Sequence, residues 1–172
     1  PYKEDGIQAP TEEAISDAAT RKVTKALNVK CSLNDIKSAV AQGYPVIIAL
    51  EVFEGLNSST GFVVRPTDEE RAASDDNSHA MVICGYSDPE KVFIVRNSWG
   101  VRFGDKGYCY IPYSYITDPE LMHQATIITQ ISEAEIKALP DSNKASVSFN
   151  KSDANVQAAI LRTLVDEELE NI

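Results

Sequence analysis

The sequence lacks a long apolar run, an excess of basic residues and any closely paired cysteines. Its longest apolar stretch, PVIIAL at 45–50, is far shorter than the roughly 18 residues that a membrane-spanning helix needs, so we expect no membrane span. Sixteen Lys and Arg stand against 26 Asp and Glu, which gives a formal net charge of −10. Because this charge opposes long-range attraction to polyanions, we expect no nucleic-acid partner.

The three cysteines, Cys31, Cys84 and Cys109, are too few and too scattered for a disulfide framework or a zinc site. Cys84 and Cys109 each fall inside an apolar, β-like run, so we predict that both are small buried hydrophobic side chains. The sequence therefore implies neither a metal ion nor an organic cofactor.

An initiating methionine and a signal peptide are also missing, because the chain begins Pro1-Tyr2-Lys3. From this beginning we expect a processed or truncated polypeptide. The 172 residues, of which 43% are hydrophobic, are enough to bury the core of one domain with an appendage.

The first 43 residues carry two helix signals. Residues 1–30 are polar, and we predict a loop there with a short helix that begins near Thr11. The segment SLNDIKSAVAQG at 32–43 places its apolar residues at helical spacing, with Ser32 as a cap and Gly43 as a stop. This pattern predicts a short amphipathic helix.

The rest of the chain is dominated by strand signals up to residue 131. The β-branched and aromatic run at 44–53 predicts a buried strand, and residues 54–78 predict a long connection. Further β-like runs at 79–86, 91–97 and 107–113 predict an antiparallel meander, followed by a strand at 125–131. Near-helical spacing beyond that strand predicts an acidic helical appendage at 132–172. The expected fold class is α+β.

His79 and Asn97 lie at the ends of two predicted neighbouring strands, so their side chains can meet at one edge of the sheet. An amide oxygen that holds one ring nitrogen of an imidazole fixes its tautomer and leaves the other nitrogen free to act on a nucleophile's proton. Trp99 could cover that hydrogen bond from water. The alternative is a histidine satisfied in the core and an asparagine in a turn.

Three motifs in the same order resemble the right-hand domain of the papain-like cysteine peptidases, the family that includes the cathepsins. They are SHAMVICGY at 78–86, FIVRNSWG at 93–100 and FGDKGYCYIPYSYI at 103–116. The helix and strand signals at 32–54 also resemble the segment that precedes the histidine in that family. The resemblance covers residues 1–131 and leaves 132–172, a separate C-terminal extension, unexplained.

The resemblance implies a papain-like right-hand lobe, with a twisted antiparallel sheet or partial barrel and a short helix. His79 would be the general base and acid, Asn97 its orienting partner and Trp99 the shield, with acyl transfer through a thioester. Ser78 and Ala80 match positions that line a substrate pocket, for which we predict an apolar preference. The partner would be a peptide or protein substrate. By resemblance alone, a lysosome-like, vacuolar, periplasmic or secreted setting is favoured.

The nucleophile of this mechanism has no counterpart in the chain. None of the three cysteines stands in a Cys-Gly-Ser-Cys-Trp type context, and the family's oxyanion-hole glutamine is also absent. The family spacing places the cysteine roughly 50 to 70 residues before Pro1, either upstream or on a companion chain. We therefore expect this chain alone to be inactive. The alternative function is a catalytically inactive papain-like domain that serves as a structural or binding module.

Two other polar features receive less specific interpretations. His123 has no motif around it, so we expect a surface or packing role. Asp75, Asp76 and Asn77 are three consecutive oxygen-bearing residues, which do not by themselves make a calcium cage, and we interpret them as a solvated acidic loop.

Overall fold

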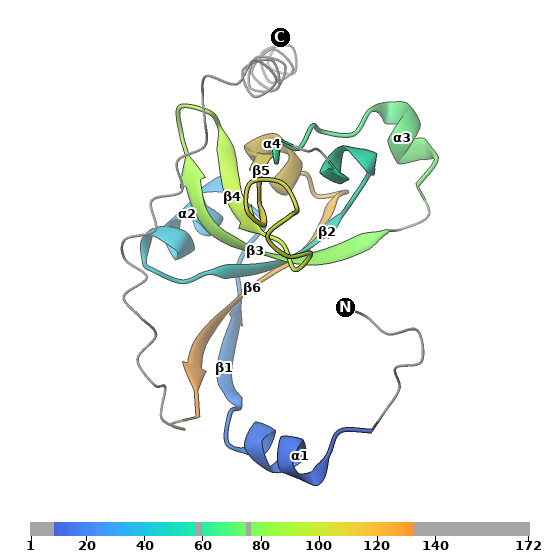
Figure 1. Cartoon of the computed structure of the whole chain (residues 1–172). Coiled ribbons are helices and arrows are strands. Elements are labelled where there is room, and N and C mark those ends of the chain that lie inside the picture. Colours follow the sequence, from blue (N-terminus) through green and yellow to red (C-terminus); the bar gives the residue numbers. More distant parts are fainter. Residues whose placement is uncertain (1–8, 58–59, 75–76, 133–172) are drawn as a thin grey trace.

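The computed structural model describes residues 9–57, 60–74 and 77–132, which form a six-stranded antiparallel sheet with short helices (Figure 1). The sheet order is β1-β6-β2-β3-β4-β5. The strands are β1 (Val23–Asn28), β2 (Val46–Glu51), β3 (Ser78–Ser87), β4 (Val92–Arg96), β5 (Tyr108–Pro112) and β6 (Met122–Ile131). The helices are α1 (Glu12–Ala19), α2 (Leu33–Ala41), α3 (Asp68–Ala72) and α4 (Tyr113–Ile116), with a 3-10 turn η1 (Glu54–Asn57). The expected α+β class is confirmed.

The predicted helix after Ser32 is present as α2. The Ser32 hydroxyl accepts a hydrogen bond from the Asp35 amide at 3.2 Å, and Gly43 adopts a φ of +86° just beyond the last turn. Ile36 and Ala39 on its inner face are buried, and the helix packs against β3. The cap and the glycine stop therefore act as the sequence indicated.

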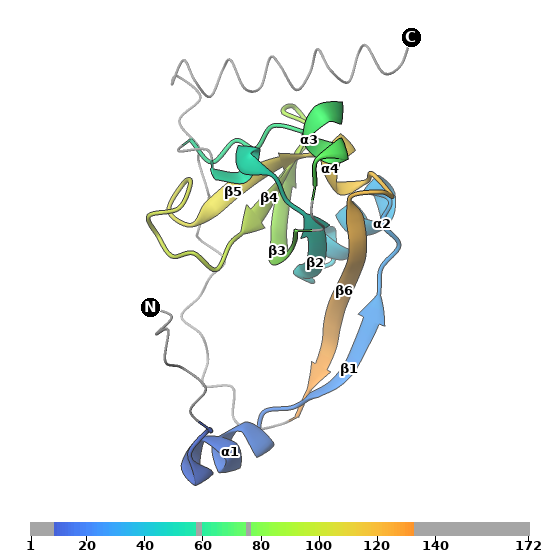
Figure 2. The ribbon, with the colours of Figure 1, turned by 90° about the vertical axis from the view of Figure 1, so that its right-hand side faces the viewer.

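The first 30 residues contain a strand that the sequence did not reveal. The short helix near Thr11 is confirmed as α1, but β1 follows it and pairs antiparallel with β6. All six residues of β1 are exposed, so VTKALN shows none of the alternation that marks a half-buried strand. Figures 1 and 2 show β1 and the end of β6 reaching away from the other strands as a two-stranded ribbon.

The long connection at 54–78 also contains helical structure that the sequence pattern does not predict. It contains η1 and α3, and α3 begins with a reciprocal capping box between Thr67 and Glu70. The guanidinium of Arg65 pairs with Asp118 at 2.7 Å, which ties the connection to the segment before β6. The connection is therefore held in place before it reaches β3.

The predicted meander of β3, β4 and β5 is confirmed, and it packs its inner face into the core. Along β2, residues Val46, Ile48 and Leu50 are buried while Ile47 between them is exposed. The same alternation on β3 buries Met81 and Ile83. The final strand begins at Met122, three residues earlier than predicted, and lies between β1 and β2.

The predicted helical appendage at 132–172 lies outside the described residues, apart from Ser132, so the domain boundary stays a prediction. Within the described part of the chain, no helix has the length and hydrophobicity that crossing a membrane requires.

We expect Ile48→Ala to lower the free energy of unfolding by about 2–5 kcal/mol, because it removes a side chain that is only 1% exposed from the core. The matched control Ile47→Ala, on the opposite face of the same strand, should cost much less, because that side chain is 38% exposed. Urea unfolding of both variants measures the difference. Equal losses would contradict the assigned faces of β2.

Candidate active site

His79 and Asn97 come together because β3 and β4 are antiparallel neighbours. His79 is the second residue of β3 and lies opposite Leu50 of β2, while Asn97 directly follows β4. The backbone N–H of Asn97 donates to the carbonyl of Gly107 at 3.0 Å, which continues the pairing of β4 with β5. His79 Nε2 lies 2.8 Å from Asn97 Oδ1. The structure thus brings together the two residues that the sequence analysis paired.

The hydrogen bonds of Asn97 determine the tautomer of the neutral imidazole. Its Oδ1 also lies 2.7 Å from the backbone amide of Ser98, which can only donate. The atom between these two groups is therefore the amide oxygen, and His79 Nε2 must be the donor. In the neutral ring this leaves Nδ1 unprotonated, with a lone pair that can accept a proton.

Trp99 lies against the imidazole. The two ring centroids are 5.0 Å apart at an interplanar angle of 35°, and Phe103 meets the indole edge-on at 5.1 Å. Trp99 remains 47% exposed, whereas Asn97 is 3% exposed. Asn97 Nδ2 is buried and finds no acceptor among the described residues.

The loop that carries Trp99 depends on glycines where backbones approach closely. Gly104 has a φ of +48°, and a Cβ there would lie 2.3 Å from the carbonyl oxygen of Tyr108. Gly61 from the long connection packs against Gly104. This contact between two glycines lets the loop pack closely against the long connection.

Ser78 and Ala80 are both exposed and lie on the same face of the sheet. Ala80 is paired with Ala49 of β2, and Ala49 is paired on its other side with Gln124 of β6. Gln124 is therefore a neighbour of the predicted pocket that the sequence analysis missed. No local signal marks it, because its place depends on the register between β2 and β6.

Glu51 is a second residue that the sequence analysis missed. It is 8% exposed, lies opposite Ser78, and its carboxylate accepts a hydrogen bond from the Ser74 hydroxyl. Its carbonyl oxygen accepts from the Tyr115 hydroxyl at 2.9 Å. The next residue, Val52, donates to the carbonyl of Asn77 at 3.0 Å. These bonds hold the chain just before His79.

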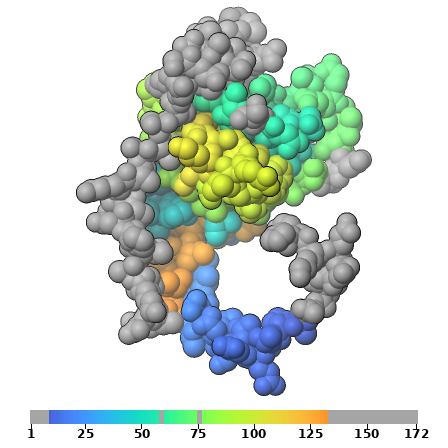
Figure 3. Space-filling model, viewed as in Figure 1, coloured from blue at the N-terminus to red at the C-terminus, as the bar shows by residue number. Residues whose placement is uncertain are grey.

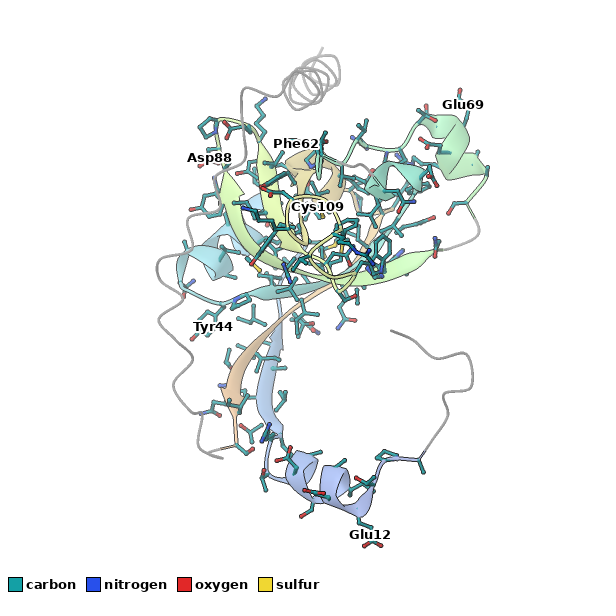
Figure 4. All side chains as sticks on the ribbon, viewed as in Figure 1. Glu12, Tyr44, Phe62, Glu69, Asp88 and Cys109 are labelled. Carbon is teal, nitrogen blue, oxygen red and sulfur yellow. The ribbon has the colours of Figure 1, made fainter. Side chains whose placement is uncertain are left out.

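None of the three cysteines hydrogen-bonds to His79 in the described structure. Cys109 is fully buried in the core (Figure 4), and burial raises the pKa of its thiol to about 12. The prediction that Cys84 is buried is wrong, because Met81 and Ile83 take the inner positions of β3 and leave Cys84 outward. At the rise of a strand, Cys84 lies about 17 Å along β3 from His79.

Desolvation also raises the pKa of the Cys31 and Cys84 thiols from their ordinary values, which disfavours the thiolate that a nucleophile needs. His123 is exposed on β6. Asp75 and Asp76 fall outside the described residues. Within the ranges that the structure describes, no three His, Cys, Asp or Glu side chains gather as metal ligands would.

The model of the papain family of cysteine proteases matches residues 1–129. The chain belongs to this family. The papain-family assignment agrees with the order of the histidine, asparagine and tryptophan motifs and with the sheet that carries them.

The chain is also similar in sequence to individual proteins whose names agree with this family. The chain is 31% identical over 136 residues to an uncharacterized peptidase C1-like protein of Acanthamoeba polyphaga mimivirus, and the match covers 72% of this chain and 43% of that protein. It is 27% identical to cathepsin S of Rattus norvegicus, with 63% of this chain and 32% of that protein covered.

A solved structure with the same fold is xylellain, a cysteine protease from Xylella fastidiosa. The TM-score is 0.65 at 28% identity, and the match covers 72% of this chain and 46% of that one. The chain therefore spans less than half the length of each of these relatives.

We expect Asn97→Ala to lower the fraction of neutral His79 that carries its proton on Nε2, because the variant removes the acceptor that holds this tautomer. Long-range ¹H–¹⁵N NMR of the neutral imidazoles measures the tautomer ratio. His123, which is exposed on β6, is the internal control and should not change. An unchanged His79 spectrum would contradict the inferred hydrogen bond.

We expect iodoacetamide to alkylate Cys84 slowly, because its thiol is exposed but its pKa is raised, and to spare Cys109 until the protein is unfolded. A pKa raised to about 12 keeps the Cys109 thiol protonated at every pH below that value, and its burial blocks the reagent. Peptide mass spectrometry with and without urea measures both sites. Rapid labelling of native Cys109 would place it outside the core.

Proposed function

We propose that this chain is the histidine- and asparagine-bearing lobe of a peptidase that hydrolyses peptide bonds by a Cys-His-Asn mechanism. The cysteine would lie on an upstream lobe or a companion chain. One observation carries the proposal: Nε2 of His79 donates to Asn97 Oδ1 at 2.8 Å, in a chain of the papain family. That bond orients an imidazole whose other nitrogen is available to a nucleophile.

In the proposed reaction, Nδ1 of His79 takes the proton of the cysteine thiol, and the resulting imidazolium stabilises the thiolate. The thiolate attacks the peptide carbonyl, and His79 then gives its proton to the leaving amine as the thioester forms. Water attacks the thioester while His79 accepts the water's proton. The acid product leaves, and the proton returns to the cysteine.

The roles of the remaining residues follow from their positions. Asn97 keeps the ring oriented through both protonation states, since Nε2 remains a donor in each. Trp99 limits the access of water to this bond from the ring side. Ser78 and Ala80, on the exposed face beside Ala49, would contact the acyl part of the substrate and favour an apolar side chain there.

We expect His79→Ala to lower kcat/KM by about 10²–10⁴-fold in the protein complemented with its cysteine-bearing lobe, because the variant removes the proton carrier. Asn97→Ala should lower kcat/KM less, and the control His123→Ala should leave it unchanged. Hydrolysis of a fluorogenic peptide gives the rates. The 172-residue chain alone should hydrolyse no peptide.

A thiol-reactive epoxide probe tests the same proposal by showing which cysteine acts as the nucleophile. It should label a cysteine in the complementary lobe and none of Cys31, Cys84 and Cys109. A complemented protein that neither reacts with the probe nor cleaves peptides would refute the peptidase and favour an inactive binding module.

A further inference from the structure

Positive charge gathers in the loop at 98–107, which connects β4 to β5. The loop contains Arg102 and Lys106, both exposed. Its one carboxylate, Asp105, accepts a hydrogen bond from the Tyr110 hydroxyl at 2.7 Å. In the described part of the chain, neither Arg102 nor Lys106 forms an ion pair. The loop is thus a locally cationic surface on a chain whose formal net charge is −10.

Hydrogen bonds from Arg96 and Asn97 hold the backbone of this loop in one conformation. The guanidinium of Arg96 donates to the carbonyl of Lys106 at 2.8 Å and lies 4.8 Å over the ring of Tyr108. At the base of the loop, the backbone N–H of Asn97 donates to the carbonyl of Gly107. The two exposed cations therefore project from a backbone that is ordered before any ligand arrives, which lowers the entropic cost of binding.

The loop also has a defined place relative to the imidazole. Trp99, in the same loop, stacks against His79, and β4 and β2 flank β3 on opposite sides. A peptide whose acyl part lies over Ala49 and Ala80, on the β2 side, would carry the part beyond the cleaved bond toward the loop at 98–107. Figure 3 shows this loop, in yellow, on the open surface of the molecule.

For a peptide in contact with the loop at 98–107, the charges of the loop itself decide whether acidic or basic side chains are preferred. At an ionic strength of 0.15 M the Debye length is about 8 Å, so carboxylates spread over the rest of the molecule are largely screened from a peptide bound at the loop. Cations within a few ångströms of that peptide are screened much less. The long-range field of the chain repels an acidic peptide, but contact with the loop attracts it.

We propose that the loop at 98–107 selects peptides that carry aspartate or glutamate on the carboxyl side of the cleaved bond, through Arg102 and Lys106. The direction of the bound peptide in this inference rests on the proposed function. The chemical class of the ligand, an acidic peptide segment, rests on the charges of the loop alone.

Trp99 is the only tryptophan of the chain, so its fluorescence reports binding at the loop. The 172-residue protein is titrated with three peptides of equal length and free amino terminus: Ala-Glu-Glu-Ala, Ala-Gln-Gln-Ala and Ala-Lys-Lys-Ala amides. We expect a Kd about fivefold lower for the acidic peptide than for the neutral one, from two exposed charge pairs, and the weakest binding for the basic one. This preference should shrink in 0.5 M salt.

The test variant combines Arg102→Gln with Lys106→Gln, and the control combines Lys25→Gln with Lys30→Gln. Both variants remove two positive charges, so they change the net charge equally, but the control charges lie on and beside β1. The acidic preference should disappear in the test variant and persist in the control. Equal affinity of the acidic and neutral peptides, or a preference that survives the test variant, would overturn the inference.

Hydrolysis by the complemented protein separates this inference from the proposed function. We expect kcat/KM about fivefold higher for substrates with Glu-Glu than with Gln-Gln just beyond the cleaved bond, and the ratio should fall to about one in the test variant. Cleavage with a ratio near one in the unmodified protein overturns the selection and leaves the peptidase intact. Charge-dependent binding at Trp99 without any cleavage supports the binding of acidic peptides to the loop and refutes the peptidase.

Discussion

The amide oxygen of Asn97 accepts hydrogen bonds from two groups, the imidazole of His79 and the backbone amide of Ser98, and the geometry of the site depends on this shared acceptor. The backbone bond fixes the orientation of the amide, and the amide in turn fixes the ring. The arrangement leaves Asn97 Nδ2 buried without an acceptor among the described residues. A buried donor of this kind costs about 1–3 kcal/mol, so the site carries a local penalty that the surrounding sheet must offset.

The sheet offsets that penalty because the site residues are extensions of strands whose inner faces are core. His79 continues the strand that buries Met81 and Ile83, and Asn97 follows the strand that buries Phe93 and Val95. A shift of either strand by one position in its pairing would turn its buried side chains toward solvent. Hydrophobic burial therefore sets the register, and the register sets the distance between imidazole and amide.

Local signals explain which parts of this structure could be predicted from the sequence. The cap at Ser32, the glycine at 43 and the apolar runs of the meander each act within a few residues, and the helix and strands that they predict are present. The strand β1 has no buried face and so left no periodic signal. The pairing of Ala49 with Gln124 is a contact between distant segments, which a single sequence does not encode locally. The predicted burial of Cys84 is wrong because its run is apolar on both faces, although only one face is core.

The ribbon of β1 and β6 has a consequence for the order in which the protein opens. No side chain of β1 is buried, so this strand is held by backbone hydrogen bonds to β6 rather than by the core. The exposed strand β1 can therefore separate from β6 without disturbing the packing around β2, β3 and β4. β6 itself remains paired with β2 and keeps Met122, Ala125 and Ile127 in the core. The molecule thus contains two levels of cooperativity: an outer strand, β1, that opens at low free energy, and an inner sheet, with the imidazole and its amide, that opens only with the whole fold.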